Sequence, residues 1–284
     1  SRPKGVEKSV SDSDPGKKMN INFRLINRIY AHRFLLASMA VQELHNRYAG
    51  TFAGILWSVI HPVTLVLIYW FVFTVGFKIQ VIGDHPFVLT FMCGIVPWFF
   101  FSEAVLTSCD SITAKAYLIK KSIFPAEILP LLNLLIAFIT HVFMIVILLV
   151  FLHAYGIYIS VYAIQVLYLI CCLFVLCIGF GWLISAINIF YKDIGQALTI
   201  VLNAWFWLTP VIWPINAIPE SYRGIFQVNP MYYIVEGYRA AFLYKTWMFA
   251  DPWPTVYFWV FALFFIWFGA HVFRKLKPMF GDVI

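Results

Sequence analysis

Six apolar segments, each about as long as a membrane crossing, dominate this sequence of 284 residues. An α-helix needs roughly 20 residues to cross the hydrocarbon core of a bilayer. The segments lie at about 55–77, 86–106, 128–152, 161–190, 197–217 and 253–273. Backbone polar groups find no water inside the bilayer, so segments of this kind fold as helices. The sequence therefore predicts an all-α polytopic membrane protein with six transmembrane helices in residues 55–273.

Composition agrees with a membrane protein and argues against a nucleic-acid-binding one. Charged residues are 12% of the chain, about half the share typical of soluble domains, and 62% of the residues are hydrophobic. The net charge of +7 is explained by basic cytoplasmic loops, because no soluble domain offers a basic face to nucleic acid. The five cysteines have no metal-type or disulfide-type spacing and are expected to be packing residues.

Lysine and arginine residues are divided unequally between the two sides of the membrane. Six spans place both termini on one side. With the termini inside, sixteen of the 20 basic residues are cytoplasmic, and only Lys78, Arg223, Arg239 and Lys245 are external. The positive-inside rule favours this orientation. The sequence predicts a multi-pass protein with both termini in the cytoplasm.

Polar and amphipathic segments precede the first span. Residues 1–22 lack an apolar core, which excludes a cleaved signal peptide and predicts a disordered cytoplasmic tail. Within 23–54, Tyr30, Phe34, Ala37, Val41, Leu44 and Tyr48 form one apolar stripe at helical spacing. We expect an amphipathic helix at the inner membrane surface, in contact with lipid. A soluble helix packed on the tail is the alternative.

Two further segments lie outside the spans. Residues 217–252 are too long for a plain connection and contain NPMYYIVEGYRAAFL, which predicts short external re-entrant helices between spans five and six. The residues expected to matter in this external region are Asn229, Pro230, Tyr232, Glu236 and Arg239. Residues 274–284 are expected to form a cytoplasmic C-terminal tail.

The segment 110–126, within DSITAKAYLIKKSIFPAEILP, has an order that a plain loop would not need. Wound as a helix, Ile112, Ala116, Ile119 and Ile123 share one side. Three lysines, Lys115, Lys120 and Lys121, spread over the remaining surface. Pro125 would end the helix, because proline cannot continue it without losing a backbone hydrogen bond. The pattern predicts a cytoplasmic helix that lies against another surface.

The spans contain no group of side chains suited to catalysis. His61, Glu103 and His141 each stand alone in the sequence, and a lone polar residue in a multi-span protein is usually a packing contact. Motifs for metal hydrolysis and for nucleotide binding are absent from the sequence. We therefore expect no catalytic residues, no metal and no cofactor.

Four motifs, joined in this order with six spans, resemble the type-2 ATP-binding-cassette (ABC) permeases that export bacterial polysaccharides such as O-antigen, capsule and teichoic acid. ELHNRYAGTFAGILWSVIHPV resembles the family's start of span one, and LIKKSIFPAEILPL its cytoplasmic segment after span two. NPMYYIVEGYRAAFL resembles its external region, and FRKLKPMFGDVI its C-terminal end. The resemblance runs from about Phe23 to the end; the longer polar tail departs from the pattern.

The resemblance implies a homodimer of this chain joined to two copies of a separate ATPase subunit in the bacterial inner membrane. It implies export of a lipid-linked polysaccharide, with ATP hydrolysed by the partner. The segment after span two would then be the coupling helix in a groove of the ATPase, formed by Ile112, Lys115, Ala116, Ile119, Lys120, Lys121, Ile123, Phe124 and Pro125. A membrane-surface helix without a protein partner is the alternative.

A path for polysaccharide needs many weak contacts, which aromatic faces provide. The residues expected on this path are Tyr48, Trp57, Tyr69, Asn203, Trp207 and Trp213. Aromatic residues that only anchor the spans or pack between them are the alternative.

Two other functions compete with export. One is an integral-membrane transferase that acts on a lipid-linked sugar, and the other is drug or ion-coupled transport. The absence of clustered carboxylates or histidines argues against the transferase. The lack of charges within the membrane argues against ion coupling.

Overall fold

The computed structural model describes residues 33–79, 81–82, 84–121, 125–215 and 218–283. The predicted tail at 1–22, the first part of the amphipathic segment, Ile123 and Phe124 lie outside the described residues.

Five helices in the described part of the chain are long and apolar enough to cross a membrane. They span Trp57–Gly76 (α3 Trp57–Phe71 with the π-helical turn η3 Val72–Gly76), α4 Phe87–Cys109, α6 Ile128–Ala154, Val161–Asn188 (η5 Val161–Ile164 with α7 Gln165–Asn188) and Pro252–Val283. The last comprises α11 Pro252–Leu276, η9 Lys277–Met279 and α12 Phe280–Val283. The all-α polytopic fold is confirmed, and the count of six spans stays a prediction.

The fifth predicted span is shorter than the sequence suggests. Helix α8 covers Ile194–Leu208, 15 residues, where an apolar run to residue 217 was expected. It ends because Thr209 adopts an extended backbone with φ −100° and ψ 133°. Thr209 precedes Pro210, whose ring disfavours the helical conformation in the residue before it.

Shorter elements complete the fold. Before the first long helix come α2 Arg33–Tyr48 and η2 Gly54–Leu56, and between α4 and α6 come η4 Thr113–Lys115 and α5 Ala116–Lys121. After α8 come α9 Glu220–Gln227, α10 Pro230–Arg239, the π-helical turn η7 Ala240–Tyr244 and η8 Met248–Ala250. A two-stranded antiparallel ribbon, β1 Val81–Ile82 with β2 His85–Pro86, joins α3 to α4.

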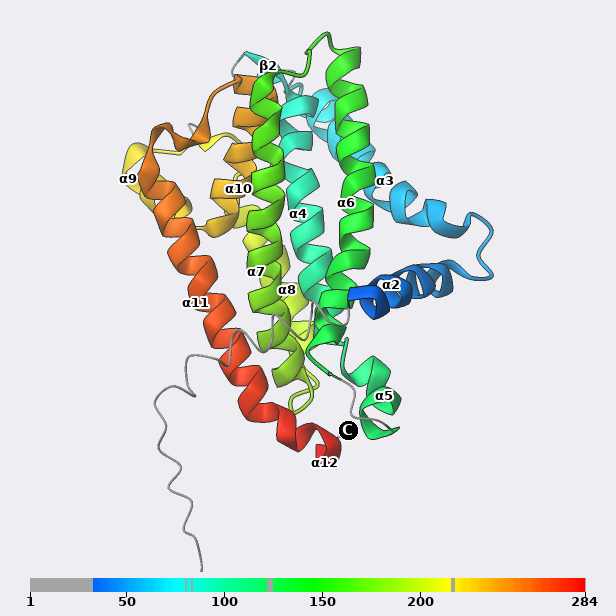
Figure 1. Ribbon diagram of the computed structural model, residues 1–284. Helices are drawn as coiled ribbons and strands as arrows, with labels where there is room; N and C mark the ends of the chain where they lie inside the picture. Colours follow the sequence, from blue (N-terminus) through cyan, green and yellow to red (C-terminus); the bar gives the residue numbers. More distant parts are fainter. Residues whose placement is uncertain (1–32, 80, 83, 122–124, 216–217, 284) are drawn as a thin grey trace, which may run out of the picture.

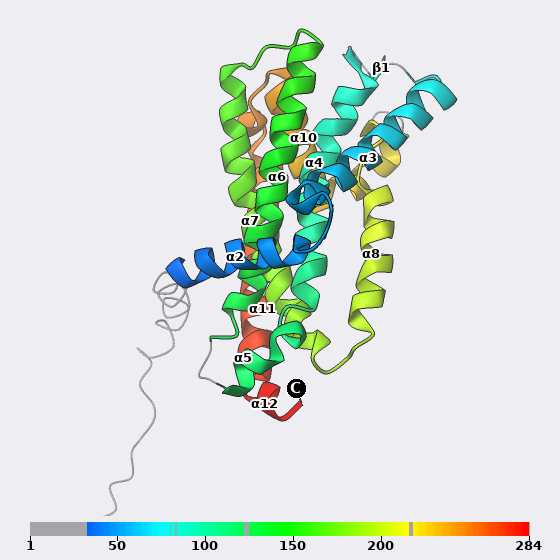
Figure 2. The same ribbon diagram turned by 90° about the vertical axis from the view of Figure 1, so that its right-hand side faces the viewer.

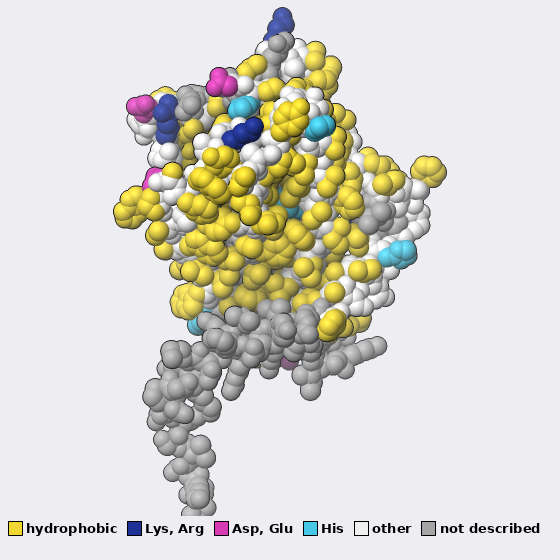
Figure 3. Space-filling model, turned by 45° about the horizontal axis from the view of Figure 1, so that its top comes forward, with side chains coloured by type: hydrophobic (Ala, Val, Ile, Leu, Met, Phe, Trp, Pro, Cys, Tyr) yellow, Lys and Arg dark blue, Asp and Glu magenta, His cyan; other side chains and the backbone are white. Residues whose placement is uncertain are grey.

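Helix α4 stands in the middle of the bundle, with α6, α7, α8 and α10 around it (Figures 1 and 2). In its most apolar stretch 83% of the residues are buried, against 11% in α3 at the edge. Hydrophobic side chains cover the flank seen in Figure 3, as expected of a surface in contact with lipid tails.

Helices α7 and α11 pack closely because each has a glycine at the crossing. A Cβ atom on Gly179 would lie 2.8 Å from the backbone nitrogen of Ile266, a distance that real Cβ atoms do not reach. Gly269 faces the Gly179 carbonyl in turn. Close approach of small residues is a common way for helices to associate in membranes.

Helix α2 crosses the side of the bundle (Figure 2), and it has two apolar faces. Leu36, Ala40 and Leu44 are buried against the bundle, whereas Phe34 and Val41 are 75% and 68% exposed. Leu44 therefore does not share the exposed face of the predicted stripe. The position of α2 at the membrane surface stays a prediction.

A second cluster of buried side chains, here called the basal cluster, closes the end of the bundle near α5 and α12 (Figure 1). Its members are Ile112, Ala126, Leu129, Trp182, Ala186, Ile189, Ala270, Phe273 and Phe280. Residues 277–283, here called the C-terminal turn, are helical and pack on this cluster through Phe280. The expected C-terminal tail is thus folded onto the bundle, because a phenylalanine gains from leaving water.

Candidate transport cavity and coupling surface

A cavity of about 630 Å³ lies between α3, α4 and α8, and is here called the α3–α4–α8 cavity. Aromatic rings and hydroxyl or amide groups share its walls. Its residues are Trp57, Ser58, His61, Pro62, Leu65 and Tyr69 from α3; Ile95, Trp98, Phe99, Ser102, Glu103, Leu106 and Thr107 from α4; Thr140 from α6; and Thr199, Leu202, Asn203 and Phe206 from α8. Within α3, α4 and α8 the lining residues recur three or four positions apart, which places them on one face of each helix.

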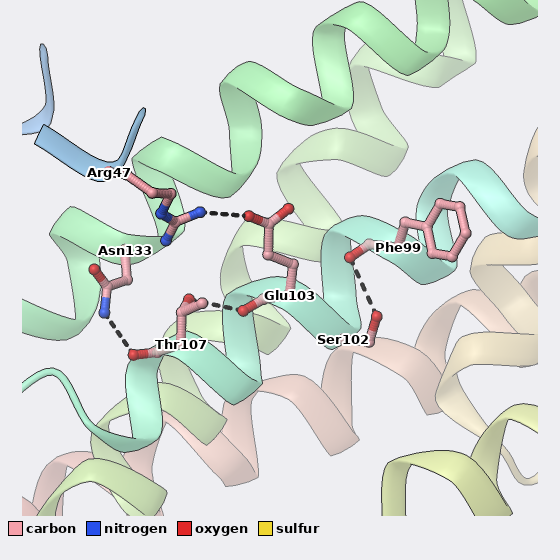
Figure 4. A network of polar contacts seen from close by, with 6 residues as sticks. All are labelled: Arg47, Phe99, Ser102, Glu103, Thr107 and Asn133. Carbon is pink, nitrogen blue, oxygen red and sulfur yellow. Dashed lines mark hydrogen bonds and ion pairs between the residues drawn. The ribbon is translucent and has the colours of Figure 1, made fainter. Parts of the chain in front are cut away.

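An ion pair marks the wall of this cavity on the side of α2 (Figure 4). The Arg47 Nη1 atom lies 2.9 Å from Glu103 Oε1, and both side chains are about one-third exposed or less. The Thr107 hydroxyl donates to the Glu103 carbonyl at 2.7 Å, and Asn133 donates to the Thr107 carbonyl. Glu103 is therefore a residue of the cavity wall that forms an ion pair with an arginine from α2.

The structure brings three of the predicted path residues together. Trp57, Tyr69 and Asn203 line the cavity. Trp207 is 55% exposed and is not among the residues that line the cavity, and Trp213 lies beyond the end of α8. The Trp213 Nε1–H donates to the Trp207 carbonyl at 3.2 Å. Tyr48 is the last residue of α2.

The cavity also contains residues that the path prediction missed. Trp98 and Phe206 contribute aromatic rings, with centroids 5.5 Å apart, and His61 and Glu103 contribute polar groups. Trp57, His61, Leu65 and Tyr69 recur every four residues, and this spacing was a signal that would have added His61 to the path.

The described part of the predicted coupling segment, residues 110–121 and 125–126, lies against the basal cluster. Ile112 is fully buried in it, and the partly buried Ile119 packs on its outside. Ala116 begins α5 and is partly buried, Lys120 is exposed and Lys121 ends the helix. Pro125 follows shortly before α6.

Lys115 was expected on the free surface of the helix, but it is largely buried in a contact with α2. Its Nζ atom lies 2.8 Å from Glu43 Oε2 of α2, and its side chain is only 13% exposed. Glu43 and Arg47 stand one turn apart on α2, so the same helix is joined to the coupling segment and to the cavity wall.

In the region predicted to be external, α10 is more buried than a short interfacial helix would be, whereas α9 has no buried residue. Asn229 caps α10: its Oδ1 accepts the Met231 backbone N–H at 3.0 Å and the Trp205 indole N–H at 2.8 Å. Pro230 occupies the first turn, where its missing N–H costs nothing. Tyr232 and Glu236 are partly exposed, whereas Arg239 is 1% exposed. Helix α10 packs against α4, α7 and α11, and its re-entrant character stays a prediction.

The described residues contain no group of three or more His, Cys, Asp or Glu side chains placed to hold a metal ion. The described residues thus form a polytopic membrane protein with an aromatic and polar cavity among its helices.

Comparison with known proteins places the chain within that class. Residues 35–243 match the family model described as ABC-2 type transporter, and the chain belongs to this family. It is 28% identical over 263 residues to the O-antigen export system permease protein RfbA of Myxococcus xanthus, which covers 92% of this chain and 99% of that protein. It is 28% identical over 253 residues to the protein of the same name from Klebsiella pneumoniae, covering 88% and 95%. The polysialic acid transport protein KpsM of Escherichia coli is 22% identical over 207 residues, covering 72% and 79%.

Proposed function

We propose that this chain is the membrane permease of an ATP-driven exporter that moves a polysaccharide, such as lipid-linked O-antigen, across the bacterial cytoplasmic membrane. The observation that carries the proposal is the similarity over nearly the whole length to permeases named for O-antigen export. The family membership and the long apolar helices agree with it.

The permease works with a separate ATPase subunit in two copies, and two copies of this chain form the membrane part. The small buried fraction of α3 supports this arrangement, because most of the surface of that helix remains available to lipid or to a second copy. Both termini lie in the cytoplasm, as the distribution of basic residues favours. The end of the bundle that carries α5 and α12 then faces the ATPase.

The α3–α4–α8 cavity is part of the route of the polysaccharide. Trp57, Tyr69 and Trp98 offer flat faces to the apolar sides of sugar rings. Hydroxyl and amide groups such as those of Ser102 and Asn203 exchange hydrogen bonds with sugar hydroxyls. Such contacts are individually weak, which suits a chain that must slide.

A transferase is not supported. The curated relatives are named for export and transport. Glu103, the carboxylate on the cavity wall, is engaged in an ion pair with Arg47 and has no second carboxylate beside it among the cavity residues.

The test compares two tryptophans in the permease–ATPase complex. Trp57→Ala removes a cavity ring, and Trp253→Ala removes a ring that is 76% exposed at the start of α11. We expect Trp57→Ala to slow export of long polysaccharide while the complex still assembles, and Trp253→Ala to leave export unchanged. Equal export by Trp57→Ala and the unaltered permease would contradict a route through this cavity.

A further inference from the structure

Helix α11 runs along the outside of the bundle (Figure 1), and its exposed face changes from apolar to basic near its C-terminal end. From Trp253 to Phe268 every exposed residue is apolar. His271 is the first exposed ionisable residue after them, and Arg274 and Lys275 follow in the last turn of the helix. These residues recur three or four positions apart, on the side of α11 that faces away from the glycine crossing with α7.

The position of this change matches the thickness of a bilayer. From Trp253 to His271 the helix rises about 27 Å, at about 1.5 Å per residue. The hydrocarbon core of a bilayer is about 30 Å thick. If Trp253 lies at one membrane surface, then His271, Arg274 and Lys275 lie among the lipid headgroups of the opposite leaflet, on the side of the C-terminal turn.

Stacked rings on the same face lead up to these basic residues, and are here called the α11 aromatic wall. The ring centroids of Phe264 and Phe268 lie 5.8 Å apart with an interplanar angle of 4°, and the Phe264 centroid lies 6.5 Å from that of Trp267. Trp267 stacks in turn on His271, with centroids 5.8 Å apart and an interplanar angle of 21°. The wall offers an acyl chain an ordered apolar surface that ends at the basic residues.

The cations at the end of the wall are not neutralised by their own helix, because α11 has no Asp or Glu between Pro252 and Leu276. Arg274 Nε donates to the Ala270 carbonyl at 3.0 Å, and this bond occupies only one N–H group of the guanidinium. Lys275 is exposed. In the part of the chain that the structure describes, no ion pair joins either side chain to a carboxylate. Two cationic side chains thus meet the headgroup layer beside an apolar wall.

We propose that the C-terminal end of α11 binds an anionic glycerophospholipid of the membrane, with the lipid phosphate at Arg274 and Lys275 and an acyl chain along the α11 aromatic wall. The charge of the basic residues and the wall beside them favour this occupant. A free phosphate ion would use the cations alone, and a zwitterionic lipid gains less from them. The lipid fixes the depth of α11 directly before the C-terminal turn. This site goes beyond polysaccharide export and does not depend on it.

The experiment places the permease–ATPase complex in phosphatidylcholine nanodiscs that contain a small share of photoactivatable phosphatidylglycerol and no polysaccharide. After illumination, the labelled peptides are mapped by mass spectrometry. We expect the label within residues 264–275. Unlabelled phosphatidylglycerol added during assembly is expected to compete with it, and inorganic phosphate is not.

Two pairs of substitutions test the cations. Arg274→Gln with Lys275→Gln removes both charges from the site. Lys78→Gln with Lys245→Gln is the matched control, because it removes two exposed lysines that follow α3 and η7. We expect labelling of residues 264–275 to fall about thirtyfold in the first variant, since each cation near an anionic bilayer contributes a factor of about five. Labelling stays unchanged in the control and in Lys275→Arg.

A photoreactive phenylalanine in place of Phe268 identifies the occupant without removing a charge, and it decides the question if the double variant does not assemble. In nanodiscs with equal shares of the two lipids, we expect more adduct with phosphatidylglycerol than with phosphatidylcholine. Equal adducts with both lipids, an equal loss of labelling in the control variant, or competition by inorganic phosphate would overturn the proposal. An adduct with the ATPase or with a second copy of this chain would assign the face to a protein and overturn it as well. Each of these results leaves the proposed export function standing, because no polysaccharide is present.

Discussion

Arg239 is expected to hold together the half of the bundle that contains α10 and the start of α4. It lies on α10 with 1% of its surface exposed and donates to three acceptors. Its Nη2 lies 2.9 Å from the Val211 carbonyl, its Nε 3.3 Å from the Thr90 carbonyl, and its Nη1 2.7 Å from Glu236 Oε1. One guanidinium thus joins α10 to the N-terminal half of α4 and to the segment that follows α8.

The change Arg239→Met keeps the length of the side chain and removes all three bonds. Loss of one partner from a buried ion pair costs about 3–5 kcal/mol. Glu236 is about one-quarter exposed, so water relieves part of the cost, and we expect about 3 kcal/mol. For a chain of this size that lowers the melting temperature by about 6–12 °C.

Arg223→Met is the matched control. Arg223 also pairs with a glutamate three residues earlier, Glu220, but at 3.4 Å and with the glutamate 89% exposed. An exposed pair contributes about 0–1 kcal/mol. For both variants, the melting temperature of the purified permease is measured in detergent. The fraction that still elutes as a single species after heating is measured as well.

The double change Arg239→Met with Glu236→Gln is expected to recover part of the loss, because it leaves no unpaired carboxylate. Equal melting temperatures for Arg239→Met and Arg223→Met would refute the reasoning, and so would a double variant less stable than Arg239→Met alone.

Three other contacts give further predictions. Gly179→Val is expected to lower the melting temperature by several degrees because its Cβ meets the α11 backbone, whereas Gly224→Val, in open space, leaves it unchanged; equal values would contradict close packing at α7 and α11. Lys115→Glu is expected to uncouple ATP hydrolysis from export, and adding Glu43→Lys to restore it; no recovery in the transport assay would count against the ion pair. Asn229→Ala is expected to cost about 1–2 kcal/mol as a lost helix cap, measured by thermal unfolding, and an unchanged melting temperature would show that the cap is dispensable.

The fold class followed from the sequence because long apolar runs leave a membrane chain few alternatives. Short helices were expected within residues 217–252, and the asparagine followed by proline at 229–230, a common helix start, was the local signal that would have located the beginning of α10. The end of α8 at Leu208 depends on how Thr209 responds to the proline after it, and hydropathy alone does not report that.

Contacts between distant segments were the part that sequence reasoning missed. Arg47 and Glu103 are 56 residues apart, and Glu127 and Lys277 are 150 apart. The sequence around each of these four residues does not indicate which residue it pairs with. The two faces of α2 were hard to separate for a related reason: Leu44 fits an apolar stripe with Val41, but only tertiary packing decides which of them meets the bundle.

Transport by the purified permease–ATPase complex in proteoliposomes is the most direct measurement of ATP-driven polysaccharide export. A fluorescently labelled lipid-linked polysaccharide is supplied on the ATPase side, and its arrival on the other side is followed with and without ATP. We predict arrival only with ATP and with both subunits, and its loss in Ile119→Asp, which places a charge against the basal cluster. Arrival without ATP, or transport by Ile119→Asp at the unaltered rate, would contradict a permease driven through this coupling segment.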